Sequence, residues 1–348
     1  MDPARVLRFA TRGSALALAQ ADEVLSAATR ARPGLRVERV VIRTTGDARP
    51  DLDLGAPGAG VPAGLFTSEI QAALQRGEAD IAVHSLKDLP TGSPEGLRLA
   101  ATLPRADPRE VLLYRDAARV EARRQPLAEW RPGSRELRGF PPGLTLRRLP
   151  AGARLATSST RRRAQFLAVR PDLDVVPIRG NVPTRLQHLQ EDASFDVLLL
   201  AAAGLVRLGW QLGPRSRLIV DPRNPSATPV EPPPEGLLGT LLEAEDFIPA
   251  VGQGALGLEI RADDADAAGV CAALNHLNTW LCITAERSFL QAIGGGCHSA
   301  AGANARRLGH QLELRAWWQV DGQVRQGVAR RPAAEAERLG RELARQLT

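Results

Sequence analysis

Lysine is almost absent from this chain of 348 residues. Of the 45 lysine and arginine residues, only Lys87 is a lysine. An ammonium is a compact point charge, whereas guanidinium is a wide planar fork, so the two are not interchangeable at a built site. The composition therefore indicates that position 87 needs an ammonium. Chance retention of one lysine is the alternative.

Aromatic residues are also scarce, at 4% of the chain. The net charge of +6 favours an anionic partner. Nucleic acid is a poor candidate, because stacking platforms are few and no run of five basic residues occurs. The arginines stand in short groups beside glycine, serine and threonine. We expect a small polycarboxylate or phosphate ligand instead.

Cysteines and long apolar runs are few. Cys271, Cys282 and Cys297 have no close pairing and no metal-ligand spacing, which is typical of a reducing compartment. The longest apolar run, 197–206, is about half of a membrane span. Neither a secretory signal nor a glycine-rich nucleotide loop is visible. We expect a cytoplasmic protein that binds no metal, nucleotide, nucleic acid or membrane.

Two stretches of the chain resemble each other, 7–20 and 154–165. Each reads as a short strand ending in Ala-Thr, then a turn with serine, then a helix. Ser14 and Ser159 are predicted to cap those helices. The free amides of the first helical turn, with an arginine beside them, form a candidate anion site.

Each half continues with a second apolar strand after an acidic residue, at 80–83 and 196–200. Open α/β sheets place their ligands in the loops after such strands. The pattern predicts two similar α/β lobes that face a cleft. Coincidence between short segments remains the alternative.

The remaining segments predict the connections and a third domain. Residues 105–109 and 249–254 resemble paired crossover strands or hinges. A helix at 275–292, a strand at 311–318 and an amphipathic helix at 331–347 predict a smaller α+β domain. The expected division is 1–110 for lobe 1 (with a return segment at 250–272), 111–249 for lobe 2 and 273–348 for the third domain. Insertions at 116–150 and 221–239 are expected to be surface loops.

Three places could carry chemistry. The loop His84 to Pro90 offers imidazole, hydroxyl, ammonium and carboxylate groups after a buried strand. The alternative interpretation is a solvated turn with a lysine–aspartate ion pair at the surface. In 179–185, Asn181 is a predicted cap and Pro183 suits a first helical turn. Cys297 follows three glycines, which indicates a presented thiol; a small core residue, as most lone cysteines are, is the alternative. Cys271 and Cys282 are expected to be packing residues.

The order of the motifs resembles the porphobilinogen deaminase family over nearly the whole chain outside the two insertions. The matching segments are ATRGSALALAQ at 10–20, TTGD at 44–47, GLFTSEIQAAL at 64–74, DIAVHSLKDLPT at 80–91, RADPRE at 105–110, ATSSTRR at 156–162, RGNVPTRL at 179–186, AAGLVRLG at 202–209, PAVGQGALGLEIR at 249–261 and TAERSFLQAIGGGC at 284–297.

The resemblance implies an α/β fold with two periplasmic-binding-protein-like lobes around a cleft and a smaller C-terminal α+β domain that carries the cofactor cysteine. It implies a hydroxymethylbilane synthase, a transferase of porphyrin biosynthesis that condenses four porphobilinogen molecules. The primer would be a dipyrromethane joined to Cys297, and the protein a monomer.

The resemblance also assigns roles to individual residues. Asp88 would be the catalytic acid and would also contact the cofactor. Cofactor binding would involve Lys87, Ser85, Thr157, Ser158, Ser159, Arg161, Arg162 and Arg185. Substrate binding would involve Arg12, Ser14, Arg179, Arg185 and Arg207.

The chain departs from the family pattern in several places. The loop 55–63 has no cation where lysines are usual, Thr160 replaces a usual leucine, and Gly294 replaces a usual acidic residue. These differences concern lid behaviour and affinity. Two other classes remain open: a solute-binding protein, which would lack Cys297 and its domain, and a degenerate homologue, which should have lost Asp88 or Cys297.

Overall fold

The computed structural model describes residues 5–44, 67–122, 135–223, 231–296 and 299–348. They form two compact units, 1–108 with 248–348, and 109–247. The chain thus leaves the first unit after Pro108 and returns to it at Ile248. Both crossings lie in or next to the segments predicted to be hinges, and Ala106 N donates a hydrogen bond to the Gly254 carbonyl at 3.1 Å. The two segments thus contact each other, as predicted, although neither forms a strand.

The first unit contains a five-stranded sheet in the order β2-β1-β3-β12-β4. Its elements are β1 (Val6–Arg12), α1 (Ala15–Ala31), β2 (Arg36–Ile42), α3 (Ser68–Gln75), β3 (Ile81–Ser85), the 3₁₀ turn η1 (Leu86–Asp88), β4 (Leu97–Thr102), β12 (Leu256–Arg261) and α8 (Ala265–Leu274). Strands β2, β1 and β3 are parallel, and β12 is antiparallel to both of its neighbours.

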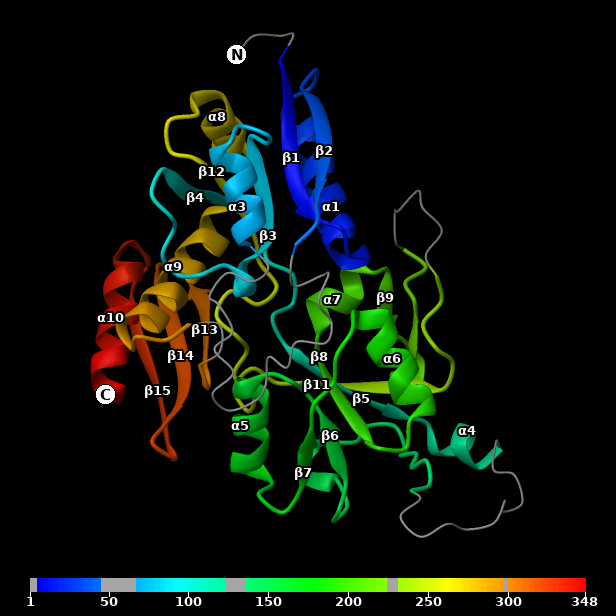
Figure 1. The fold of residues 1–348 in the computed structure, drawn as a ribbon. Coiled ribbons are helices and arrows are strands. Elements are labelled where there is room, and N and C mark those ends of the chain that lie inside the picture. The colour runs from blue at the N-terminus through cyan, green and yellow to red at the C-terminus, as the bar shows by residue number, and fades with distance from the viewer. Residues whose placement is uncertain (1–4, 45–66, 123–134, 224–230, 297–298) are drawn as a thin grey trace. The chain divides into compact units, whose positions relative to one another are not determined.

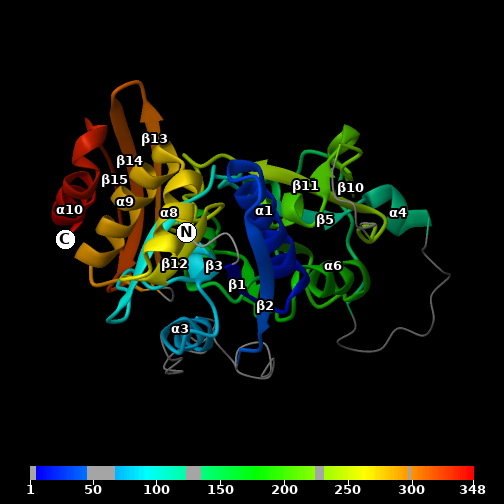
Figure 2. The ribbon, with the colours of Figure 1, turned by 90° about the horizontal axis from the view of Figure 1, so that it is seen from above.

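Successive side chains of β1 point to opposite faces of this sheet. Leu7 and Phe9 pack with α1 and α8, whereas Ala10 packs with α3. Figure 2 shows α1 and α8 on one side of the strands and α3 on the other. A sheet covered on both faces is the arrangement expected of α/β proteins.

The second unit repeats this topology in the order β7-β6-β8-β5-β11. Its elements are β5 (Glu110–Arg115), α4 (Ala117–Ala122), η2 (Leu146–Arg148), β6 (Arg154–Ala156), α5 (Thr160–Val169), β7 (Asp174–Val176), α6 (Val182–Glu191), β8 (Val197–Ala201), α7 (Ala202–Arg207), β9 (Trp210–Leu212), η3 (Pro214–Ser216), β10 (Leu218–Val220) and β11 (Leu237–Leu242). Again three strands are parallel and the fourth, β5, is antiparallel to its neighbours.

The two acidic residues noted in the sequence hold equivalent positions. Asp80 accepts a hydrogen bond from Arg8 N at 2.9 Å, and Asp196 accepts one from Arg154 N at 2.9 Å. Asp80 thereby ties the start of β3 to β1, and Asp196 ties the start of β8 to β6. The shared strand order and these two equivalent hydrogen bonds confirm the expected similarity of the two lobes.

The C-terminal part of the first unit is a three-stranded antiparallel sheet with two helices on one face (Figure 1). Its elements are α9 (Leu277–Ala292), β13 (Ala301–Leu308), β14 (Gln311–Val320), β15 (Gln323–Pro332), η4 (Ala333–Glu335) and α10 (Ala336–Leu347). The strand predicted at 311–318 is confirmed as part of β14. The helix predicted from Arg331 begins later, because Arg331 and Pro332 still pair with β14. The α/β class with a smaller α+β portion is confirmed.

The expectation that 116–150 and 221–239 are surface loops is wrong for parts of both. Phe140 and Leu149 belong to a buried core cluster, and the Phe140 ring meets Tyr114 edge-on at 6.2 Å. Leu237 and Leu238 are buried in β11. The sequence signal is weak because these apolar residues are irregularly spaced among arginines and prolines. Residues 123–134 and 224–230 of these segments lie outside the described residues.

Candidate functional site

In the first unit, the predicted site residues gather at one edge of the sheet. Arg12 ends β1, and Ser14 caps α1 by accepting a hydrogen bond from Ala17 N at 3.3 Å. The neighbouring parallel strand β3 ends at Ser85, and Lys87 and Asp88 follow in η1. The carboxyl ends of parallel neighbours share an edge, which is where such sheets bind ligands.

Buried polar contacts anchor the end of β3. The Ser85 hydroxyl is hydrogen-bonded to the amide group of Gln20, with its Oγ 2.7 Å from Nε2. His84 Nε2 lies 3.1 Å from Glu259 Oε2, and Gln71 Nε2 donates to the same carboxylate. Glu259 is fully buried. Sequence reasoning missed these partners, although a glutamate within the apolar run of β12 was a signal.

In the second unit, the predicted residues also follow the parallel strands. Thr157, Ser158, Ser159, Arg161 and Arg162 come after β6, Arg179 and Arg185 after β7, and Arg207 at the end of α7 after β8. The predicted caps are confirmed: Ser159 accepts from Arg162 N at 3.4 Å, and Asn181 accepts from Thr184 N at 2.9 Å. All these residues therefore belong to one edge of this sheet.

The hydroxyl groups after β6 shape the turn itself. Ser158 Oγ donates to the Ile178 carbonyl at 2.8 Å and accepts from Ile178 N at 3.1 Å. Thr157 Oγ1 accepts from Ser159 N at 3.2 Å. These contacts hold the turn between β6 and α5 against the loop that follows β7. Thr157 and Ser158 thus have a structural task in this unit.

Arg161 and Arg162 are both buried and share one carboxylate. Glu110, at the start of β5, is fully buried and accepts from Arg161 with one oxygen and from Arg162 with the other, the latter at 2.7 Å. Arg162 also donates to the Leu199 carbonyl at 2.9 Å. Burial lowers the pKa of Arg161, and the Glu110 carboxylate opposes that shift. Sequence reasoning missed Glu110, which begins the buried strand β5.

Three arginines after β6 and β7, Arg162, Arg179 and Arg185, lie close enough together for their positive charges to repel one another. Burial and, to a smaller extent, the nearby positive charges of Arg162 and Arg179 together lower the pKa of Arg185 to about 10. Arg185 remains charged at neutral pH, so mutual repulsion persists. A ligand with several carboxylates would relieve that repulsion through charge-assisted hydrogen bonds. The residues present therefore fit an anionic group such as a carboxylate-bearing cofactor.

Cys297 lies outside the described residues, but the other two cysteines are described. Cys271 is fully buried and Cys282 nearly so. Burial raises the pKa of Cys271 to about 12 and that of Cys282 to about 11. Since the thiolate is the reactive form, neither is suited to covalent attachment. Their expected role as packing residues is confirmed.

The part of the chain that the structure describes holds no group of three or more residues able to bind a metal ion. Within the same residues, no helix is both long and apolar enough to cross a bilayer.

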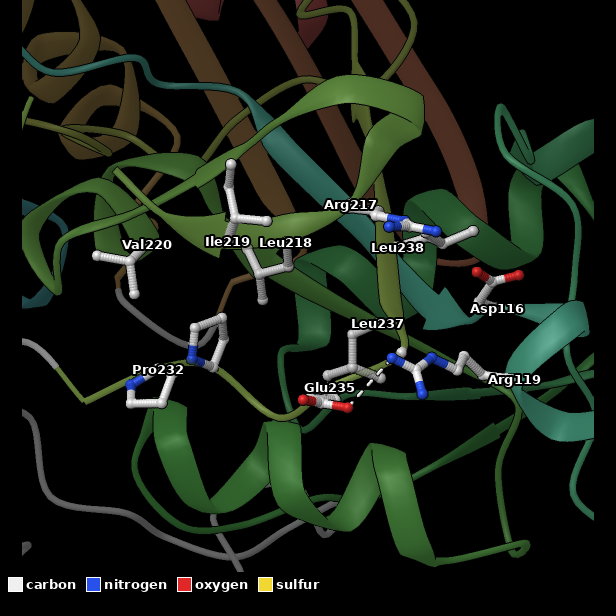
Figure 3. Close-up of a pocket in the computed structure, with 12 residues that line it drawn as sticks. Asp116, Arg119, Arg217, Leu218, Ile219, Val220, Pro232, Glu235, Leu237 and Leu238 are labelled. Carbon is white, nitrogen blue, oxygen red and sulfur yellow. Dashed lines mark ion pairs between the residues drawn. The ribbon is translucent and has the colours of Figure 1, made fainter. Parts of the chain in front are cut away.

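A cavity of about 290 Å³ lies in the second unit beside β10 and β11 (Figure 3). Leu218, Ile219 and Leu237 form part of its apolar wall, and Arg119 pairs with Glu235 at its rim at 3.2 Å. None of the predicted site residues lines this cavity, so it belongs to a different part of the unit from the arginine cluster.

Residues 7–269 match the family model described as "Porphobilinogen deaminase, dipyromethane cofactor binding domain", and 280–348 match "Porphobilinogen deaminase, C-terminal domain". A porphobilinogen deaminase of Roseiflexus sp. (strain RS-1) is 40% identical, covering 99% of this chain and 96% of that protein. One of Syntrophobacter fumaroxidans is 37% identical, covering 99% and 94%. One of Trichlorobacter lovleyi is 39% identical, covering 100% and 94%. With the family models matched in order along nearly its whole length, the chain belongs to the porphobilinogen deaminase family.

Proposed function

We propose that Asp88 is the catalytic acid of this enzyme, that Lys87 and the arginines hold its anionic ligands, and that Cys297 carries the dipyrromethane cofactor. The activity itself is hydroxymethylbilane synthase, which condenses four porphobilinogen molecules in tetrapyrrole biosynthesis. The observation that carries the proposal is the placement of Asp88. It stands directly after β3, at the same sheet edge as Arg12 and Ser14.

Asp88 is suited to handle the proton and the charge of each condensation. The carbon–nitrogen bond of the porphobilinogen aminomethyl group breaks, ammonia leaves with the electron pair, and the substrate ring becomes cationic. A carboxylic acid at position 88 can supply a proton to the departing nitrogen. As a carboxylate it then accepts a hydrogen bond from the pyrrole N–H and stabilises the positive charge. The new carbon–carbon bond joins the substrate methylene carbon to a free ring carbon of the acceptor pyrrole; that ring carbon then loses its proton to the Asp88 carboxylate, which restores the acid.

The cofactor supplies the pyrrole ring carbon to which the first unit is added. Each porphobilinogen brings two carboxylates, so the growing chain needs many cations. Arg162, Arg179 and Arg185 offer three neighbouring positive charges. Guanidinium forks match carboxylates bidentately and can orient the chain. Arg12 and Lys87 offer the corresponding cations in the first unit.

The proposal for Asp88 is tested by Asp88→Asn, with Glu95→Gln as the matched control. Glu95 is an exposed carboxylate seven residues downstream of Asp88, so both variants lose one negative charge. Turnover of primer-loaded Asp88→Asn should fall by about 10²-fold or more. Glu95→Gln should keep wild-type turnover. Equal turnover in the two variants would show that Asp88 has no catalytic part.

We also propose that the enzyme acts as a cytoplasmic monomer that binds neither nucleic acid nor membrane. The scarcity of aromatic residues that could stack on bases supports the expectation about nucleic acid. Sedimentation should give one species at the chain mass of 37.3 kDa plus its cofactor. A concentration-independent dimer would contradict it.

A further inference from the structure

Helix α9 contacts the loop that follows Asp88. Arg287 donates from Nη1 to the Leu89 carbonyl at 3.2 Å, and from Nη2 to the carbonyls of Pro90 at 2.7 Å and Thr91 at 3.0 Å. Three consecutive carbonyls are thus held by one guanidinium. Because the guanidinium is a rigid planar fork, these bonds fix the direction of the loop as well as its distance from the helix.

Apolar contacts from the same helix hold the other side of this turn. Ile283, one turn before Arg287, belongs to a buried cluster with Leu86, Leu89 and Ala255. The Leu86 amide donates to the Ala255 carbonyl at 3.0 Å. The residues just before and after Asp88 are therefore clamped to α9 and to the start of β12, while Asp88 itself stays half-buried.

The same helix ends at the glycine loop that leads to Cys297. Helix α9 ends at Ala292, Gly294 takes the left-handed conformation with φ +65°, and Gly295 N donates to the Leu290 carbonyl at 2.9 Å. A helix is stiff over a few turns, at about 1.5 Å per residue. One rigid element therefore connects the Asp88 turn to the start of the cysteine loop.

We propose that Arg287 is a positioning residue for the condensation: it fixes the Lys87–Asp88 turn relative to the glycine loop before Cys297. This inference rests on the proposed role of Asp88. Arg287 acts through the carbonyls of the loop and is not assigned a contact with substrate. Its loss should displace the Asp88 carboxylate and lower the rate of the chemical step more than substrate binding.

The test uses full-length, primer-loaded Arg287→Gln and Arg287→Lys, with Arg170→Gln as the matched control. Arg170 also holds loop carbonyls, those of Leu146 at 3.3 Å and Leu149 at 2.6 Å, but at the other end of α5 from the site turn. Intact mass first establishes cofactor loading. We expect kcat of Arg287→Gln to fall by roughly 10- to 100-fold with KM within about threefold, because a displacement of about 1 Å can cost 10²-fold. Arg287→Lys should recover part of the loss, and it carries the comparison if the glutamine variant is not recovered loaded.

Hydrogen exchange gives a readout that does not depend on activity. The backbone amides of residues 86–89 and of Thr91 should exchange faster in Arg287→Gln than in the wild type, and at the wild-type rate in Arg170→Gln. Unchanged exchange at these amides, or a kcat loss of equal size in Arg170→Gln, would overturn the proposal.

A double-mutant cycle with Asp88→Glu separates positioning from general loss of structure. If Arg287 acts through the place of the carboxylate, Arg287→Gln should cost less in the Asp88→Glu background than in the wild type. Fully multiplicative losses would overturn the proposal. Wild-type turnover in Asp88→Asn would refute the role of Asp88 instead, and is seen in that variant alone, so the two failures are distinguishable.

Discussion

Glu286→Gln should be among the most destabilising single changes in the first unit. Glu286 lies on α9 and is fully buried. Its Oε1 accepts from Arg105 at 2.5 Å and from Ala305 N at 2.8 Å, and its Oε2 accepts from Arg105 at 3.1 Å and from Gly252 N at 2.8 Å. One carboxylate thus joins the outgoing crossing segment, the returning one and β13.

Glutamine keeps the shape of this side chain but not its hydrogen bonds. Both oxygens of the Glu286 carboxylate accept hydrogen bonds from N–H groups. The NH₂ group of glutamine would replace one of these oxygens, and it would then face N–H donors to which it cannot hydrogen-bond. The Arg105 guanidinium, 11% exposed, also loses its counter-charge. Breaking a buried ion pair costs about 3–5 kcal/mol. For a unit of this size that lowers Tm by roughly 6–20 °C.

The control is Glu243→Gln, which removes the same charge from an ion pair that is largely exposed. The Glu243 side chain is 61% exposed, and its Oε1 lies 2.8 Å from Arg109 Nη1. Such a pair contributes about 0–1 kcal/mol. Calorimetry and urea unfolding of both variants measure the difference. If the free energy of unfolding of Glu286→Gln fell by less than about 1 kcal/mol, or by no more than that of Glu243→Gln, the hydrogen bonds to the Glu286 carboxylate would not stabilise the unit.

Three further predictions follow from single positions. Lys87→Arg should lower turnover by about a hundredfold, or roughly 2–3 kcal/mol of transition-state stabilisation, because the wider fork can pair with Asp88; steady-state rates within about threefold of wild type would contradict this. Gly340→Ala should lower the free energy of unfolding by about 1–3 kcal/mol, because the added Cβ would lie 2.3 Å from the Ala285 carbonyl oxygen. Gly92→Ala is the control in urea unfolding, since a Cβ at that position meets no atom within 4 Å. Asp80 has a lowered pKa because hydrogen bonds from Arg8 and Arg261 outweigh the opposing effect of burial. Its stabilising contribution is therefore present above pH ~4 and lost as pH falls through its folded pKa, so the stability difference between wild type and Asp80→Asn should shrink in acid; a difference independent of pH would argue against the ion cluster.

The sequence was most informative where local rules act alone. Ser14, Ser159 and Asn181 were predicted as caps because their side chains satisfy amides within the same helix. The apolar run at 80–83 was recognisable as a buried strand, and the residues after it therefore as a loop at the carboxyl end of a strand. These features depend on neighbours in the chain and are visible without the fold.

Long-range partners were not predictable in the same way. Glu110 meets Arg161 from 51 residues away, and Arg287 meets Leu89 from 198 residues away. Nothing local indicates which carboxylate will face which arginine. Phe140 was missed for a related reason, since an isolated apolar residue among arginines and prolines has no periodicity to reveal its burial.

The most direct test of the central claim is the intact mass of the purified native protein. The wild type should weigh more than the bare chain by two linked pyrrole units, and Cys297→Ser should have the bare chain mass. Peptide mapping should find the added mass at Cys297 and not at the buried Cys271 or Cys282. An active wild type with the bare chain mass, or with the group at another cysteine, would contradict the account.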